Sequence, residues 1–366
     1  MKRIFTVLLI ILLSLTLVVG CAQKAPTPAP TEQPKEKFKV GFIYVGPIGD
    51  AGWTYAHEQG RKMLEKELGV EAIYKESVPE SQECEKVIKD MIDQGAKVIF
   101  ATSYGFQDYV AKVAKEYPNV KFLHCSGSIL GANYANYFGS IEEPRYLSGI
   151  VAGLKTKKNS IGYVAAYDLT EVIRGINAFT LGVRSVNPKA VVKVKWTNTW
   201  FDPAKEKAAA VALLDEGVDV IAQHQDTSGP QVAAEERGVW SVGYNTDMSK
   251  MAPKAYMTAP LWNWGMYYVK TVKEIQAGTW KPEAYWGTMK DGFVDLAPLT
   301  AVAPPEAKAA VDKVKADMMA GKFNVFAGPI KDQSGKVVVP AGSSVSLPDQ
   351  LSMKWFVQGV EGKIGK

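Results

Sequence analysis

The feature that most constrains the fold is an alternation of short apolar strands with amphipathic helices, which occurs twice along the chain. The first set predicts strands at 39–45, 98–102 and 120–125. The second set predicts strands at 161–165, 191–196 and 218–222. Continuous apolar strands separated by helices indicate parallel sheets that are covered by helices on both faces. The sequence therefore predicts an α/β protein.

Capping residues and glycines mark where the helices begin and end. Asp50 is placed to cap a helix that runs to a stop at Gly69. Ser77 and Glu80 have the spacing of a capping box, ahead of a helix with an apolar stripe. Asp202 directly precedes a proline, which is typical of an N-cap followed by the first helical position.

A short internal echo predicts two similar lobes. Residues 91–99 (MIDQGAKVI) align with residues 213–221 (LLDEGVDVI), and both segments join a helix to a strand. Ligands of open α/β sheets bind beyond the carboxyl ends of the strands. With two such lobes, the predicted site is the cleft between them.

The N-terminus resembles a bacterial lipoprotein signal. Lys2 and Arg3 precede an apolar run that ends in Gly20-Cys21. We predict a signal peptide at 1–20, lipidation of Cys21, and a lipidated N-terminus with a Pro- and Lys-rich linker over 21–37. An ordinary signal peptide with an incidental cysteine is the alternative. Either way the prediction is an extracytoplasmic protein, which the lipid would anchor to the cell membrane. Cleavage leaves about 346 of 366 residues, enough for two domains.

Charge and cysteine content exclude some classes of partner. The net charge is only +5, and no run of Lys and Arg resembles a nucleic-acid patch, so no nucleic-acid partner is expected. Cys84 lies in a helical apolar stripe and Cys125 ends a predicted strand. Two buried thiols are favoured, although an extracytoplasmic pair can also form a disulfide.

Motifs for catalysis, metals and cofactors are missing from the sequence. Gly46, Gly49 and Gly52 have neither the dinucleotide nor the P-loop spacing. The histidines at 57, 124 and 224 are isolated and have no metal-ligand spacing, so structural or surface roles are favoured. We therefore predict a binding protein without catalytic residues, metal or cofactor.

The loops after the predicted strands carry aromatic, amide and carboxylate side chains. Rings can sandwich a flat ligand while carboxylates and amides bind its polar edge, and a sugar would fit the same inventory. The alternative is that each ring belongs to the core and each Asp to a helix cap. The candidate ligand-binding residues are Gly49, Asp50, Trp53, Tyr104, Gly105, Phe106, Trp200, Phe201, Asp226, Asn245, Asp247 and Trp262.

Several of these motifs together resemble one known family. The sequence resembles the basic membrane protein (BMP) family, which comprises substrate-binding lipoproteins of ABC importers related to a purine nucleoside receptor of spirochaetes. The resemblance extends over residues 38–299. The motifs that carry it are Gly49–Trp53, Thr102–Phe106, Gly175–Phe179, Trp200–Pro203 and Thr246–Met248.

The resemblance implies a type I periplasmic-binding-protein fold, with two Rossmann-like lobes, a three-stranded hinge and a ligand cleft that closes. Carried onto this chain, it places lobe 1 at 38–157 plus about 257–287. Lobe 2 then comprises 158–256 plus about 288–366. It also implies an ABC permease as partner, and a monomer is expected.

The resemblance implies a purine ligand as well. Because its first loop contains a Trp, the chain is similar to those family members that bind a free nucleobase such as adenine rather than a nucleoside. Trp53 would stack on the base together with Tyr104 or Phe106, and Trp200 would close from the other lobe. Hydrogen bonds to the base edge or a ribose are implied for Asp50, Asp226, Asn245 and Asp247. A ligand-sensing receptor of the same fold, or a nucleoside-processing extracytoplasmic enzyme, are the alternative functions.

Overall fold

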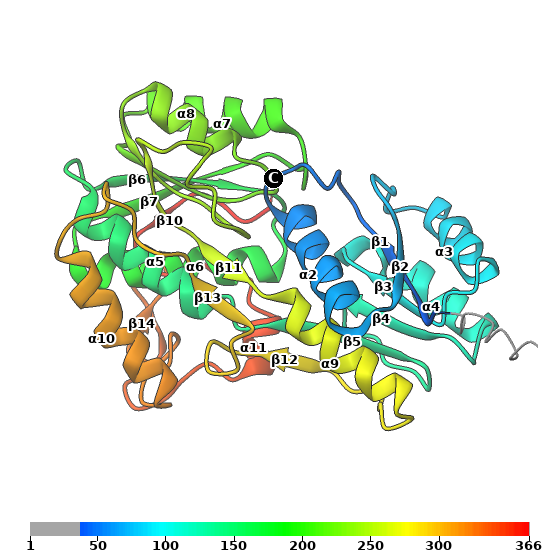
Figure 1. The fold of residues 1–366 in the computed structure, drawn as a ribbon. Coiled ribbons are helices and arrows are strands. Elements are labelled where there is room, and N and C mark those ends of the chain that lie inside the picture. Colours follow the sequence, from blue (N-terminus) through cyan, green and yellow to red (C-terminus); the bar gives the residue numbers. More distant parts are fainter. Residues whose placement is uncertain (1–36, 366) are drawn as a thin grey trace, which may run out of the picture. The chain divides into compact units, whose positions relative to one another are not determined.

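The computed structural model describes residues 37–365, which contain two six-stranded parallel sheets (Figure 1). The first sheet has the strand order β12-β5-β4-β3-β1-β2 and forms the first lobe. Its strands are β1 (Lys39–Ile43), β2 (Glu71–Lys75), β3 (Val98–Ala101), β4 (Lys121–Cys125), β5 (Tyr134–Gly139) and β12 (Tyr285–Gly287). Its helices are α2 (Trp53–Leu68), α3 (Glu83–Asp93), the 3-10 helix η1 (Tyr104–Phe106), α4 (Gln107–Glu116) and α9 (Trp264–Gln276).

The second sheet has the strand order β10-β9-β8-β6-β7-β16 and forms the second lobe. Its strands are β6 (Ser160–Ala165), β7 (Val191–Trp196), β8 (Val220–His224), β9 (Trp240–Val242), β10 (Tyr256–Thr258) and β16 (Val360–Glu361). Its helices are α5 (Glu142–Lys155), α6 (Thr170–Val186), α7 (Pro203–Asp215), α8 (Gly229–Glu236), α10 (Ala307–Met319) and α11 (Leu347–Leu351). The antiparallel pairs β11 (Pro260–Trp262) with β13 (Val294–Leu296), and β14 (Ile330–Lys331) with β15 (Val337–Val339), complete the fold.

The chain passes between the lobes three times. It leaves the first sheet after β5, because α5 packs against α6 and α10 of the second lobe. The first passage lies between β5, which ends at Gly139, and α5, which begins at Glu142. The chain returns between β10 and α9, which packs on α2, and it leaves again after β12. The last segment ends in β16, which pairs with β7 of the second sheet.

The internal echo occupies equivalent positions in the two lobes. In the first lobe Ile99 pairs in register with Gly41, where an added Cβ would lie 2.7 Å from Ile99 and 2.9 Å from Met91. In the second lobe Ile221 pairs with Gly162, which meets Ile221 and Leu213 in the same way. A helix therefore approaches a central strand closely in each lobe, and only glycine leaves room for it.

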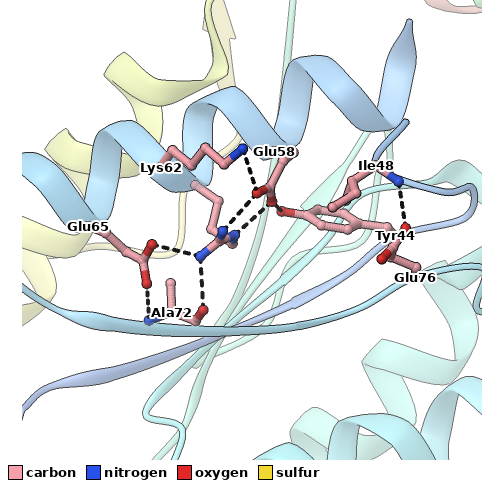
Figure 2. Close-up of polar contacts among 8 residues, drawn as sticks. Tyr44, Ile48, Glu58, Lys62, Glu65, Ala72 and Glu76 are labelled. Atoms are coloured by element: carbon pink, nitrogen blue, oxygen red, sulfur yellow. Dashed lines mark hydrogen bonds and ion pairs between the residues drawn. The ribbon is translucent and has the colours of Figure 1, made fainter. Parts of the chain in front are cut away.

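A buried ion pair attaches α2 to the first sheet (Figure 2). Arg61 Nε lies 2.7 Å from Glu58 Oε2, and the Arg61 Nη1 group donates to the carbonyl of Ala72 at 3.1 Å. Tyr44 donates to the same Glu58 carboxylate at 3.2 Å. Nearby, the backbone N–H of Ile48 donates to Glu76 at 2.7 Å. These contacts hold the N-terminal end of α2, and the loop before it, in one position.

One predicted cap is confirmed and another is wrong. Asp202 caps α7 and accepts a hydrogen bond from Lys205 N at 3.0 Å. The proposed capping box is wrong, because α3 begins only at Glu83 and Ser77 lies in the left-handed region (φ 52°). Glu80 is used elsewhere, and its carboxylate holds the loop after β3.

The two cysteines of the described segment are buried free thiols, as favoured from the sequence. Among residues 37–365, no helix combines the length and the apolar character needed to cross a membrane. The predicted signal peptide, Cys21 and most of the linker lie outside the described residues.

Candidate functional site

A cavity lies between the two lobes, at the carboxyl ends of their strands. It encloses an empty volume of about 290 Å³, its mouth included. The first lobe lines it with Trp53, Ser103, Tyr104 and Ser126. The second lobe lines it with Glu171, Trp200, His224 and Asp226. Rings, hydroxyls and carboxyls from both lobes therefore meet in one enclosed space.

Trp53 forms an ordered aromatic wall on the first lobe. Its indole N–H donates to the carbonyl of Thr102 at 2.7 Å, at the end of β3. Its ring packs edge-on against Trp264 and His57, with centroids 5.4 and 4.7 Å away. Trp262 stacks on Trp264 at 4.4 Å and is not a lining residue of the cavity. The prediction for Trp262 is thus revised from ligand contact to support of the wall.

Glu80 and His124 position the loop that carries Ser103 and Tyr104. The Glu80 carboxylate accepts from Ser103 Oγ at 2.5 Å and from Gly105 N at 2.7 Å. An added Cβ on Gly105 would meet the Glu80 side chain, so Gly105 is needed for packing and not for a ligand. His124 Nε2 contacts the Ser103 carbonyl at 2.8 Å, and burial lowers the pKa of His124 to about 4. The imidazole is therefore neutral at physiological pH.

Two carboxyl groups from the second lobe face the cavity without a protein donor. Within residues 37–365, neither Asp226 nor Glu171 accepts a hydrogen bond through its side chain, and Asp226 is only 4% exposed. Burial, reinforced by Asp50 and Glu206, raises the pKa of Asp226 well above its usual value. Burial raises the pKa of Glu171 to about 7. Buried carboxyls of this kind are stabilised by a ligand that donates hydrogen bonds to them.

Asp50 serves the loop and not the cavity. Its carboxylate accepts from the backbone N–H groups of Gly52, Thr54 and Tyr55 at 2.8, 2.8 and 2.9 Å. These bonds cap the start of α2, as the sequence predicted, and they occupy the oxygens that were also proposed for a ligand. Burial raises the pKa of Asp50 to about 6.

The lobes touch directly beside the cavity. An added Cβ on Gly52 would lie 2.8 Å from the carbonyl carbon of Asp226 and closer still to its oxygen. Thr246 Oγ1 of the second lobe donates to the carbonyl of Ala51 at 2.5 Å. These backbone contacts between lobes describe a closed cleft, in which Gly52 leaves no room for a side chain.

Four further predicted residues lie away from the cavity wall. Phe106 is completely buried in the core of the first lobe with Val110, so it cannot stack on a ligand there. Asp247 is exposed and accepts from Ser249 N at 2.9 Å, which makes it a turn residue. Gly49 is exposed as well, and an added Cβ would contact nothing within 4 Å. Phe201 is half-buried beside Gly46.

Asn245 lies deeper than the cavity lining. It is 1% exposed, has a left-handed backbone (φ 71°), and its amide nitrogen contacts the Gln225 carbonyl at 3.4 Å. Asparagine tolerates this conformation better than most residues. Its side-chain oxygen finds no hydrogen-bond partner among residues 37–365, so the turn after β9 accounts for the backbone conformation of Asn245 but not for that oxygen.

The sequence interpretation missed Ser103, Ser126, Glu171 and His224 as lining residues. Ser103 and Ser126 follow β3 and β4, His224 ends β8, and Glu171 lies in the first turn of α6, after the loop that follows β6. The rule that loops after strands form the site would have identified them. His224 had been assigned a structural or surface role because it lacks metal spacing. Over residues 37–365, no group of three or more His, Cys, Asp and Glu side chains is arranged to hold a metal ion.

Known proteins share this architecture. The Bmp family model, described as ABC transporter substrate-binding protein PnrA-like, matches residues 37–321. A purine-binding protein of Brucella abortus is 43% identical over 332 residues, covering 90% of this chain and 95% of that protein. A protein of Haloferax volcanii, named as a proposed glucose-binding protein of an ABC transporter, is 38% identical over 330 residues. The match covers 90% of this chain and 82% of that protein.

The solved structures agree on the fold. An ABC transporter solute-binding protein from Aeropyrum pernix superposes with a TM-score of 0.69 at 20% identity, over 80% of this chain and 94% of that one. It shares the type I periplasmic-binding fold, with two parallel sheets flanked by helices. With the family model matching more than half of its length, this chain belongs to the Bmp family of PnrA-like ABC transporter substrate-binding proteins.

Proposed function

We propose that this protein captures a purine nucleobase of the adenine type between its lobes and delivers it to an ABC permease. One observation carries the proposal. Rings from both lobes, Trp53 and Trp200, line the same enclosed cavity as two carboxyl groups that lack a protein donor. A flat ligand with N–H groups at its edge would stack on the rings and donate to the carboxyls. The purine-binding name of the 43% identical relative supports this ligand class.

A free base suits the two carboxyl groups better than a nucleoside does. Adenine offers an exocyclic amino group and a ring N–H, which are donors for Asp226 and Glu171. In a nucleoside the glycosidic bond replaces the ring N–H, and the ribose needs additional space in the cavity. A monosaccharide is the second candidate, since the Haloferax relative is named for glucose and sugar hydroxyls also donate to carboxyls and stack on Trp.

The mechanism is closure of the lobes on the ligand. The ligand contacts both lobes only in the closed form, so binding shifts the population toward that form. The Gly52–Asp226 and Ala51–Thr246 contacts stabilise the same closed form. The permease would then recognise the closed surface. Lipidation of Cys21 and an extracytoplasmic location complete the proposal, with the linker before residue 38 connecting lipid and lobes.

Calorimetric titration of residues 37–366, which form one compact unit, tests the ligand class. The protein is unfolded and refolded first, so that carried-over ligand is removed. Adenine, adenosine, inosine and glucose are then titrated separately. Micromolar or tighter binding of adenine, with weaker binding of adenosine, is expected. Preference for adenosine would assign the ribose to the carboxyls, and binding of glucose alone would replace the purine proposal.

A further inference from the structure

Arg145, on α5, is a fully buried cation without a carboxylate partner. Its side chain is 0% exposed, and Nη1 donates to the Gln223 carbonyl at 2.5 Å. Its Nε and Nη2 atoms find no acceptor within the described chain, and it takes part in no ion pair there. The guanidinium carbon lies 3.6 Å from the centroid of the Tyr244 ring, which offsets part of the charge. A buried charge that lacks a counter-charge is costly, so a negative group beside it would stabilise the fold.

Three polar atoms without a protein partner converge beside Gly175 of α6. An added Cβ on Gly175 would lie 3.5 Å from Arg145 Nε, 3.5 Å from His224 Nδ1 and 3.8 Å from Tyr163 Oη. All three atoms are buried, and none finds a hydrogen-bond partner among residues 37–365. They come from α5, β8 and β6, and each can donate a hydrogen bond.

The surrounding charge favours an anion over a water molecule. Arg174, the residue directly before Gly175 in α6, pairs with Glu142 at 3.3 Å, and its Nη1 and Nη2 atoms find no partner among residues 37–365. Two buried guanidinium groups thus share one ion-paired carboxylate. Burial, and then Arg145 and Arg174, hold the pKa of His224 well below its usual range, so the imidazole adds no charge. A neutral water would leave the charge of Arg145 uncompensated.

We propose that the second lobe binds a monatomic anion of the chloride class beside Gly175, held by Arg145, Tyr163 and His224. An ion that is held by three single donor atoms is small, which favours a halide over sulfate or phosphate. Arg145 Nε–H and Tyr163 O–H would each donate a charge-assisted hydrogen bond to the anion. The site is separate from the ligand cavity, although His224 lines both.

The anion would also fix the tautomer of His224, and thereby decide whether the imidazole donates to the ligand or accepts from it. If Nδ1 carries the proton and donates to the anion, Nε2 is left as an acceptor. His224 then offers a ligand N–H group a third acceptor, after Asp226 and Glu171. This consequence rests on the proposed function, whereas the anion site itself does not.

Thermal unfolding of the unliganded protein, in sodium chloride against sodium gluconate at equal ionic strength, tests the site. We expect chloride to raise Tm by about 2–4 °C in a saturable way, with bromide acting similarly. Gly175→Ala would place a methyl group in the site at ordinary contact distances, so it should fold and lose the halide response. Gly131→Ala, whose nearest neighbour would be Tyr134 at 3.5 Å, is the matched control and should keep it.

A bromide-soaked crystal provides the second measurement. An anomalous peak beside Gly175, absent from the Gly175→Ala variant, is expected. The proposal would be overturned if no bromide peak appears and, in addition, either Tm is equal in chloride and gluconate or Gly175→Ala responds to chloride as strongly as the natural protein. A buried water would then remain as the occupant. Because no purine is used, failure here is distinguishable from failure of the proposed ligand, which the calorimetric titration measures.

Discussion

The two walls of the cleft differ in the side chains that lie behind them. Behind Trp53, the first lobe is an aromatic cluster in which Trp262, Trp264 and His57 pack ring against ring. Behind His224 and Asp226, the second lobe contains the buried guanidinium groups of Arg145 and Arg174, and two nitrogen atoms of each find no hydrogen-bond partner in the described chain. The first wall is thus fixed by its own packing and supplies shape. The second wall depends on what binds to it and supplies hydrogen-bond selectivity.

Trp53→Ala should show the largest effect on both affinity and stability. Stacking is worth about 1–3 kcal/mol, so ligand affinity should fall by about 5- to 150-fold. The same change removes a buried side chain from the aromatic cluster, which costs about 3–5 kcal/mol of unfolding free energy. Trp200→Ala is the comparison, since Trp200 is half-buried: affinity should fall while Tm changes little. Calorimetry and thermal unfolding separate the two effects, and equal losses of Tm would contradict the difference between the walls.

Asp226→Asn should lower affinity by about 2- to 10-fold, because a single hydrogen bond contributes about 0.5–1.5 kcal/mol. Stability of the unliganded protein should hold or rise, since the change removes a buried acid near Asp50 and Glu206. Calorimetry against adenine measures the loss, and denaturant unfolding measures stability. A variant that is destabilised, with unchanged affinity, would show that Asp226 acts inside the fold and not on a ligand.

Gly52→Ala should prevent full closure and cost several-fold in affinity. The new methyl group would collide with the Asp226 backbone, which cannot move aside as a flexible side chain could. Small-angle scattering should show that added ligand compacts the natural protein more than the variant. Thr246→Val removes only the hydrogen bond to Ala51 and serves as the milder companion. Equal compaction in all three proteins would contradict the role assigned to this contact.

The pH dependence of stability should show that ionisation of Glu171, in the second wall, destabilises the folded protein. Burial and Glu80 raise the pKa of Glu171 to about 7, against the lowering effect of Arg174, so the folded state binds this proton more tightly than the unfolded state. The cost of its ionisation is absent below about pH 4.5 and complete above about pH 7. Unfolding free energy should therefore fall as pH rises from about 4.5 to 7 and level off above that. Glu171→Gln should reduce that slope, and an unchanged slope would assign it to other acids.

Asp247→Asn should have the smallest effect. Its carboxylate lies in an exposed turn and accepts only from Ser249 N within the described residues. Affinity for adenine should stay within twofold in calorimetry. A tenfold loss would return Asp247 to the list of ligand contacts and place the ligand outside the cavity described above.

The echo between 91–99 and 213–221 shows how far sequence alone leads. It predicted two lobes, and the two segments occupy equivalent helix-to-strand junctions, with Gly41 and Gly162 at matching positions. The strand-end rule brought Trp53, Tyr104, Trp200 and Asp226 into one cavity. Phe106, which the same rule selected, lies in the core instead, because two residues along a tight turn separate its ring from that of Tyr104 in the cavity.

The sequence by itself determined the α/β class and the repeated lobes, because strand periodicity and helix caps are local properties of the chain. The family followed from the resemblance of short motifs, which are local as well. Only the tertiary structure decided which polar groups find partners. Asp50 accepts three hydrogen bonds from its own loop, whereas Arg145 Nε and Nη2 find no acceptor among residues 37–365, and no local sequence pattern distinguishes the two cases. Partners for buried groups come from elements distant in sequence, so the chemistry of the second wall is a property of packing. The same holds for Gly52. A side chain at this position would collide with the Asp226 backbone, but only because the two lobes meet there.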